Sequence, residues 1–240
     1  MEKRKLKLLS RETIAKGTMM FNFEKPVNFV FKSGQTIDIA LINPPETDEE
    51  GNIRTFSLVS APYENTLSIA TRLRDSAFKR VLRSMPLNTE VEIEGPYGSF
   101  TLQNNSEKPA VFLVGGIGIT PFFSILKNAA NNKLPHKIFL FYSNRTPEDT
   151  PFLKPLTELQ DFNSNYSLIC TMTDMEKSKS DWGGEKGYIT KEMIEKYVED
   201  IETPIYYSAG PADMVAAMRK IIEEIGIDDD NVRTEEFSGY

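Results

Sequence analysis

The sequence of 240 residues has few of the side chains that disulfides and most metal sites require, with one cysteine, Cys170, and one histidine, His136. One cysteine excludes an intrachain disulfide, a thiolate zinc cage and a cysteine-held iron–sulfur cluster, and one histidine excludes a multi-histidine metal site within the chain. We therefore predict no metal site. Cys170 lies in an apolar run and is expected to be a small buried residue. His136, between a proline and a lysine, is interpreted as an exposed loop residue rather than a catalytic base.

The sequence also lacks an excess of basic charge and any long apolar run. Lys and Arg total 28 against 35 Asp and Glu, a formal net charge of −7, which argues against nucleic-acid binding because that requires a basic surface. The longest mostly apolar run, residues 110–123, contains three glycines and a proline and is too short to span a bilayer. Polar residues interrupt the basic N-terminal stretch where a signal peptide would be apolar. We expect no membrane partner and a cytoplasmic location.

The pattern of the sequence changes near residue 105. Before it, β-rich runs alternate with turn residues, and strands are predicted at 5–9, 18–23, 35–41, 55–59, 67–72 and 91–94, with one amphipathic helix at 76–83. Six strands with one short helix favour a small antiparallel β-barrel. We therefore predict a first domain over residues 1–104.

After a polar link, strands and helices alternate. Continuous apolar runs predict strands covered on both faces at 110–114, 137–142, 166–171 and 204–208. Helices are predicted at 121–130, with Thr120 as N-cap and Pro121 in the first helical position, at 190–198, and at 211–225, ended by Gly226. This pattern favours a doubly wound parallel αβα domain over residues 105–240.

Two predicted strands of this second domain run into glycine turns. Gly116 and Gly118 lack Cβ atoms, so a phosphate could approach the backbone, and the following helix N-terminus favours an anion. A second turn, Gly210-Pro211, would lie at the same edge of the sheet, which favours a nucleotide spanning both turns. The alternatives are a tight turn without a ligand and, at Gly210-Pro211, a simple helix start.

One predicted strand of the barrel, Arg54-Thr-Phe-Ser-Leu-Val-Ser60, combines an arginine, an aromatic residue and hydroxyls. Alternation places Arg54, Phe56 and Leu58 on one face. Arginine suits a diphosphate and an aromatic ring suits a flat heterocycle. Taken alone, the same residues also fit an ordinary strand.

Together these motifs resemble those of the ferredoxin–NADP reductase superfamily over essentially the whole chain. Arg54-x-Phe56-Ser57-x-x-Ser60 is similar to the flavin motif R-x-Y/F-S-x-x-S. Gly95-Pro-Tyr-Gly98, Gly115-Gly-Ile-Gly-Ile-Thr-Pro121, Ala209-Gly-Pro211 and Glu235-Glu-Phe-Ser-Gly-Tyr240 follow in the family's order. The resemblance implies an N-terminal FAD-binding barrel, a C-terminal pyridine-nucleotide domain and hydride transfer between nicotinamide and flavin.

The resemblance also implies residue roles. Arg54 would hold the flavin diphosphate, Phe56 would pack against the ring and ribityl chain, and Ser57 would bond near the flavin N5. Further FAD contacts are implied for Thr55, for the strand residues Ile69, Ala70 and Thr71, and for the helix start Asp75, Ser76, Ala77 and Phe78, whose amides would bind the pyrophosphate and so favour FAD over FMN. NAD(P)H contacts are implied for Gly115, Gly116, Gly118, Thr120, Arg145, Thr173, Ala209, Gly210, Pro211 and Met214.

The end of the chain completes the implied site. Tyr240 would stack on the isoalloxazine and move when nicotinamide enters. Glu235 or Glu236 would supply a carboxylate near the flavin, with a solvated charge as the alternative for each. Ser57, Glu235, Glu236 and Tyr240 are therefore the candidate catalytic residues.

Two positions depart from the family pattern. Ala209 stands where the family often has a cysteine close to the transferred hydride, which predicts a difference in rate or nucleotide preference. Thr173 is followed by Asp174 rather than by arginine, and a carboxylate there would repel a 2′-phosphate, so NADH is favoured over NADPH. Arg145, Lys177 or Lys179 could still reach such a phosphate.

The function implied is that of an FAD-dependent NAD(P)H oxidoreductase. The sequence carries no cluster-ligating cysteines, globin segment or transmembrane part, so the expected acceptor is separate: a ferredoxin-like protein, another redox subunit or a small molecule. Two alternatives are a reductase that uses FAD more loosely and a non-catalytic electron-transfer or nucleotide-sensing subunit of a larger redox complex.

Overall fold

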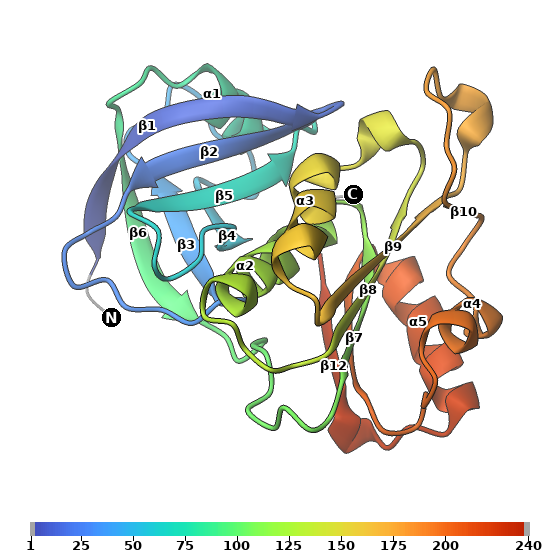
Figure 1. Ribbon diagram of the computed structural model, residues 1–240. Helices are drawn as coiled ribbons and strands as arrows, with labels where there is room; N and C mark the ends of the chain where they lie inside the picture. Colours follow the sequence, from blue (N-terminus) through green and yellow to red (C-terminus); the bar gives the residue numbers. More distant parts are fainter. Residues whose placement is uncertain (1–2, 238–240) are drawn as a thin grey trace. The chain divides into compact units, whose positions relative to one another are not determined.

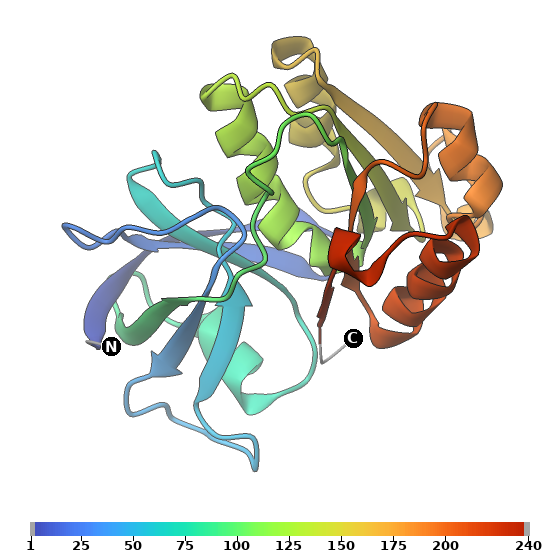
Figure 2. The ribbon, with the colours of Figure 1, turned by 90° about the horizontal axis from the view of Figure 1, so that it is seen from below.

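The computed structural model describes residues 3–237, and the chain divides into two compact units (Figures 1 and 2). Unit 1 comprises Met1–Thr101 and Thr120–Asn128, and unit 2 comprises Leu102–Ile119 and Ala129–Tyr240. No helix within residues 3–237 has the length and apolar character needed to cross a membrane.

Unit 1 is built on a six-stranded antiparallel sheet with the order β4-β3-β6-β1-β2-β5. The strands are β1 (Arg4–Ala15), β2 (Thr18–Glu24), β3 (Thr36–Leu41), β4 (Ile53–Ser57), β5 (Thr66–Arg72) and β6 (Glu90–Tyr97), and all six were predicted. In β3, Ile37, Ile39 and Leu41 are buried while the residues between them are partly exposed. This period of two turns one face of the sheet toward an apolar core.

The helix α1 (Ala77–Ser84) packs on that core. Its N-cap is Ser76, whose hydroxyl accepts a hydrogen bond from the Lys79 amide at 3.4 Å. Phe78, Val81 and Leu82 are buried, which confirms the predicted apolar face.

Unit 2 is built on a six-stranded parallel sheet with the order β10-β9-β8-β7-β11-β12. The strands are β7 (Ala110–Gly115), β8 (Ile138–Asn144), β9 (Tyr166–Met172), β10 (Glu185–Lys186), β11 (Ile205–Gly210) and β12 (Val232–Glu236). Every residue of β7 and β11 is buried, as expected for strands covered on both faces. Figure 1 shows α4 (Lys191–Tyr197) and α5 (Ala212–Ile225) on one face and α3 (Leu153–Phe162) on the other, which confirms the doubly wound fold.

The helix α2 (Ile119–Asn131) begins earlier than predicted. A 3₁₀ turn, Gly116–Gly118, leads directly into it, so Thr120 and Pro121 lie inside its first turn and neither is a cap or first residue. Proline is tolerated there because the first-turn amides have no partner within the helix. Residues 120–128 of this helix belong to unit 1, where the Ser124 hydroxyl donates to the Ser60 carbonyl at 2.6 Å.

Further features correct the sequence predictions. The helix α3 and the strands β10 and β12 were not predicted, because Leu156 is the one residue of α3 that is buried, β10 has only two residues, and β12 carries three charged residues in five. His136 is buried rather than exposed, and its Nε2 lies 2.8 Å from the Gln103 carbonyl oxygen. Cys170 is buried as expected, and desolvation raises the pKa of its thiol to about 12.

Candidate functional site

The carboxyl ends of β7 and β11 form a glycine-lined edge in unit 2. The two strands are parallel neighbours, with Ala209 opposite Val114, so the two predicted glycine turns lie side by side. A Cβ on Gly118 would come 2.5 Å from the Ala209 carbonyl oxygen, and one on Gly115 would overlap the Met214 sulfur. The two turns can therefore pack this closely only because these positions carry no side chains.

The same edge carries helix N-termini. The turn containing Gly116, which has a φ of +52°, leads into α2, and Pro211 is the N-cap of α5. Amides at a helix N-terminus favour an anion. Thr120 lies just inside α2 and is buried. The edge thus has the donor types that suit the phosphates of a dinucleotide.

Glu235 has the most perturbed carboxyl group of this edge. It lies on β12 opposite Ala209, and its buried Oε2 has no hydrogen-bond partner within the described part of the chain. Desolvation raises its pKa to about 7, so the carboxyl group changes charge near neutral pH. Its neighbour Glu236 is exposed, which fits the solvated alternative. Tyr240 lies outside the described residues.

The carboxyl ends of β8 and β9 bring Arg145, Thr173 and Asp174 together. The Asp174 amide donates to the Arg145 carbonyl at 2.9 Å, and the Thr173 hydroxyl donates to the Asn144 carbonyl at 3.2 Å. The Asp174 carboxylate is 2.6 Å from the Lys177 Nζ. The carboxylate that would face a 2′-phosphate is therefore paired with a largely exposed lysine.

A glutamate that the sequence reasoning missed fixes the loop that follows β9. The Glu148 carboxylate accepts hydrogen bonds from the Ser178 and Ser180 hydroxyls and from the Lys179 amide. Backbone amides, its own first, and the Ser180 hydroxyl lower its pKa to about 2. Glu148 therefore stays ionised and holds residues 178–180 in place.

In unit 1, an arginine and two aromatic rings form a cluster between β4 and α1. The Arg54 guanidinium carbon lies 5.4 Å from the centre of the Phe78 ring, and the ring centres of Phe56 and Phe78 are 5.8 Å apart. Ser57 is also buried. Phe56 and Ser57 are predicted on opposite faces of β4, so neither face of the strand is exposed to solvent at this end. The Ser57 hydroxyl has no hydrogen-bond partner among residues 3–237. A buried free hydroxyl calls for a partner, which a bound ligand can supply.

The other flavin residues predicted from the sequence lie on β4, on β5 and at the start of α1. Ile69, Ala70 and Thr71 are buried on β5, and Ala77 and Phe78 are buried at the start of α1. Asp75 is exposed and forms an ion pair with Arg80. The Thr55 hydroxyl donates a hydrogen bond to the Asp38 carboxylate. The Ala77 amide donates to the Asp48 carboxylate at 2.8 Å, a residue that the sequence reasoning also missed. The cation, the helix amides and the aromatic rings fit a diphosphate and a flat heterocycle.

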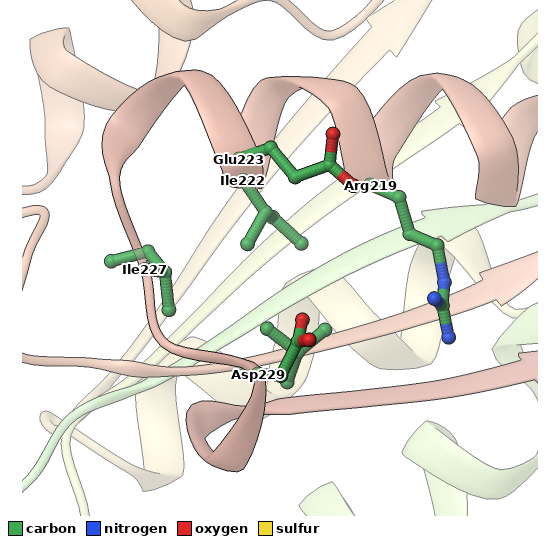
Figure 3. A pocket seen from close by; sticks show the side chains of 6 residues that line it. Arg219, Ile222, Glu223, Ile227 and Asp229 are labelled. Carbon is green, nitrogen blue, oxygen red and sulfur yellow. The ribbon is translucent and has the colours of Figure 1, made fainter.

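A separate cavity of about 270 Å³ lies in unit 2 between the end of α5 and the start of β12 (Figure 3). It is lined by Arg219, Ile222, Glu223, Ile227, Asp229 and Val232. Val232 begins β12 and pairs with Tyr206 near the start of β11, so the cavity lies at the opposite end of these strands from the glycine edge. None of the predicted site residues lines it.

Known proteins share both the sequence pattern and the fold. Residues 112–220 match the model of the oxidoreductase NAD-binding domain. A ferredoxin NADP+ reductase from Neisseria gonorrhoeae with bound FAD and NADP superposes with a TM-score of 0.81 at 19% identity, covering 98% of both chains. The flavohem-like FAD/NAD-binding domain of a nitric oxide dioxygenase from Vibrio cholerae gives 0.82 at 18% identity, with the same coverage. The second unit thus matches the NAD-binding domain over residues 112–220, and the whole chain shares the fold of these two structures.

The curated relatives of this chain are longer than it is. A glycine betaine monooxygenase reductase subunit from Chromohalobacter salexigens is 26% identical over 231 residues, which cover 95% of this chain and 61% of that protein. One subunit of a Na(+)-translocating NADH-quinone reductase from Idiomarina loihiensis is 26% identical over 204 residues, covering 83% and 48%. The chain thus spans about half to three fifths of the length of these relatives.

Proposed function

We propose that this protein is an FAD-dependent NAD(P)H oxidoreductase that transfers a hydride between nicotinamide and flavin and passes electrons to a separate acceptor. The proposal is supported by two dissimilar features in one chain: the cluster of Arg54 with aromatic rings in unit 1, and the glycine edge beside helix N-termini in unit 2. The acceptor is a ferredoxin-like protein, another redox subunit or a small molecule, as the names of the reductase subunits among its relatives suggest.

Under this proposal each of the two domains binds one of the two cofactors. Residues 1–104 would form the FAD-binding domain, in which Arg54 would neutralise the diphosphate, Phe56 would pack against the flavin and the Ser57 hydroxyl would hydrogen-bond near N5. Residues 105–240 form the NAD(P)-binding domain, in which the backbone around Gly116 and Gly118 binds phosphate. Bound flavin supplies the ability to take up two electrons and release them singly.

The protein must also orient the reacting groups and exclude water from them. Hydride transfer requires the nicotinamide C4 to contact the flavin N5 in a fixed orientation. Glu235, whose pKa of about 7 leaves it partly protonated at neutral pH, can hold or release a proton at the edge that binds nicotinamide. We place the reaction in the cytoplasm, supported by the single buried thiol of Cys170, which needs no oxidising compartment.

The cofactor content of the purified protein tests the proposal. We expect a yellow protein that releases FAD, rather than FMN, when it is denatured. A colourless protein that binds neither flavin but still binds nicotinamide nucleotide would contradict the proposal and favour a nucleotide-sensing subunit.

The choice between nicotinamide nucleotides is predicted to depend on Asp174. Replacing Asp174 with asparagine removes the charge that repels a 2′-phosphate, so the ratio of kcat/KM for NADPH to that for NADH should rise about tenfold. Steady-state kinetics with both nucleotides measure this ratio. The control is Glu176→Gln, which removes a nearby charge and should leave the ratio unchanged; equal effects of the two variants would show that Asp174 does not face the ribose.

A further inference from the structure

An acidic loop of unit 1 covers the cationic cluster around Arg54. Four of the five residues at 46–50 are acidic, namely Glu46, Asp48, Glu49 and Glu50. This acidic loop joins β3 to β4, and Arg54 lies just beyond it on β4. The loop therefore brings several negative charges to the position where the proposed function requires a diphosphate.

Asp48 makes the contacts that a phosphate would make. Its Oδ2 accepts a hydrogen bond from the Ala77 amide at 2.8 Å, and its Oδ1 lies 3.5 Å from the Arg54 Nη2. The same Nη2 is 2.6 Å from the Glu50 carboxylate. The guanidinium and the first amide of α1 are thus both engaged by carboxylates of the loop.

A second contact fixes the loop to α1 outside this cluster. The Glu46 carboxylate lies 2.7 Å from the Arg80 Nη2 and also accepts from the Arg80 Nε at 3.1 Å. A guanidinium that binds one carboxylate through two nitrogens fixes its orientation as well as its distance. Glu46 therefore helps to keep Asp48 against Arg54 and Ala77.

We propose that Asp48 is an intramolecular substitute for the flavin diphosphate, occupying the position between Arg54 and the start of α1 until FAD displaces it. This inference rests on the proposed function, because it assigns Asp48 a role at that function's FAD site. A carboxylate and a diphosphate compete for the same donors, and their like charges repel each other, so they cannot share the site. The side chains of Arg54 and Asp48 are 20% and 32% exposed, so solvent screens this competition only in part.

The charge state of Asp48 agrees with this role. The hydrogen bond from the Ala77 amide, with a further contribution from Arg54, lowers its pKa, so the carboxylate is ionised at neutral pH. The loop keeps the cationic cluster paired when no flavin is bound and lowers the apparent affinity for FAD by the fraction of molecules in which Asp48 holds the site. This contact makes the flavin exchangeable rather than permanently held.

Titration of the full-length apoprotein with FAD, followed by the quenching of flavin fluorescence, tests the inference. Asp48→Asn keeps the size of the side chain and removes its charge, so FAD should bind about tenfold more tightly. The control is Glu49→Gln, which removes one charge from the same loop at a residue with no hydrogen bond or ion pair recorded among residues 3–237, and its affinity should stay within about twofold of the wild type. If Asp48→Asn does not fold, Glu46→Gln, which loosens the loop from α1, should shift the affinity in the same direction.

Thermal unfolding gives an independent measurement. Because Asp48 stabilises only the flavin-free state, the Asp48→Asn apoprotein should unfold about 2–4 °C below the wild type, whereas the two FAD-saturated proteins should unfold together. Wild-type protein that binds FAD while Asp48→Asn binds it no more tightly would overturn this inference alone. Failure of the wild type to bind FAD would overturn the proposed function and this inference with it.

Discussion

An Arg54→Ala variant is expected to bind FAD about 100-fold more weakly than the wild type. The variant loses the packing of the guanidinium over Phe78 and, under the proposed function, the charge that would neutralise the diphosphate. Truncating one partner of a hydrogen-bonded charge pair costs roughly 2–5 kcal/mol, and the lower end of that range corresponds to the predicted change. The FAD retained per chain after desalting, together with a fluorescence titration, measures the loss.

Arg83→Ala is the matched control for this variant. Arg83 lies in the last turn of α1 and is exposed, so its removal takes the same charge from unit 1 without touching the Arg54 cluster on β4. Its FAD content should equal that of the wild type. Equal losses from the two variants would mean that the net charge of the surface, rather than Arg54, determines retention.

The second large effect concerns stability rather than binding. Glu235 has a folded-state pKa of about 7 against an ordinary value of 4.5, because its buried carboxyl group is desolvated. Between these two pH values the folded chain binds more protons than the unfolded chain, so the free energy of unfolding falls as the pH rises. The decrease in the free energy of unfolding that Glu235 contributes should reach about 3 kcal/mol by pH 8.

Glu235→Gln should therefore be more stable than the wild type at pH 8 by up to about 3 kcal/mol, and nearly equal to it at pH 4. Urea unfolding at several pH values measures the difference. Glu236→Gln, at the exposed neighbouring position, should follow the wild-type curve. If the Glu235→Gln and wild-type curves run parallel from pH 4 to pH 8, the carboxyl group of Glu235 is not desolvated in the folded chain.

The strands of both units could be predicted because their side chains alone specify them. The alternation around Ile37 and Ile39 and the continuous apolar run of β7 indicate one-sided and two-sided burial without any knowledge of neighbours. The cap at Ser76 could be predicted for the same reason, since its hydroxyl bonds to an amide three residues away.

Features that depend on partners distant in the sequence could not be predicted. β12 is polar and forms a strand because it pairs in parallel with β11. His136 is buried where its ring nitrogen forms a hydrogen bond with the carbonyl oxygen of Gln103, which is 33 residues away in the sequence. The start of α2 was misplaced because Thr120 and Pro121 are typical of a helix start, whereas the glycines before them already turn as a 3₁₀ helix. The contact of Asp48 with Ala77 joins residues 29 apart, and the acidic composition of the loop was its one sequence indication.

The central claim is that one chain binds a flavin and a nicotinamide and moves a hydride between them. Anaerobic titration of the FAD-loaded protein with NADH, and separately with NADPH, tests it most directly. We predict that the flavin absorbance bleaches in proportion to the nicotinamide oxidised, with one nucleotide consumed per flavin and NADH acting more efficiently. Flavin that stays oxidised in the presence of both nucleotides would contradict the account.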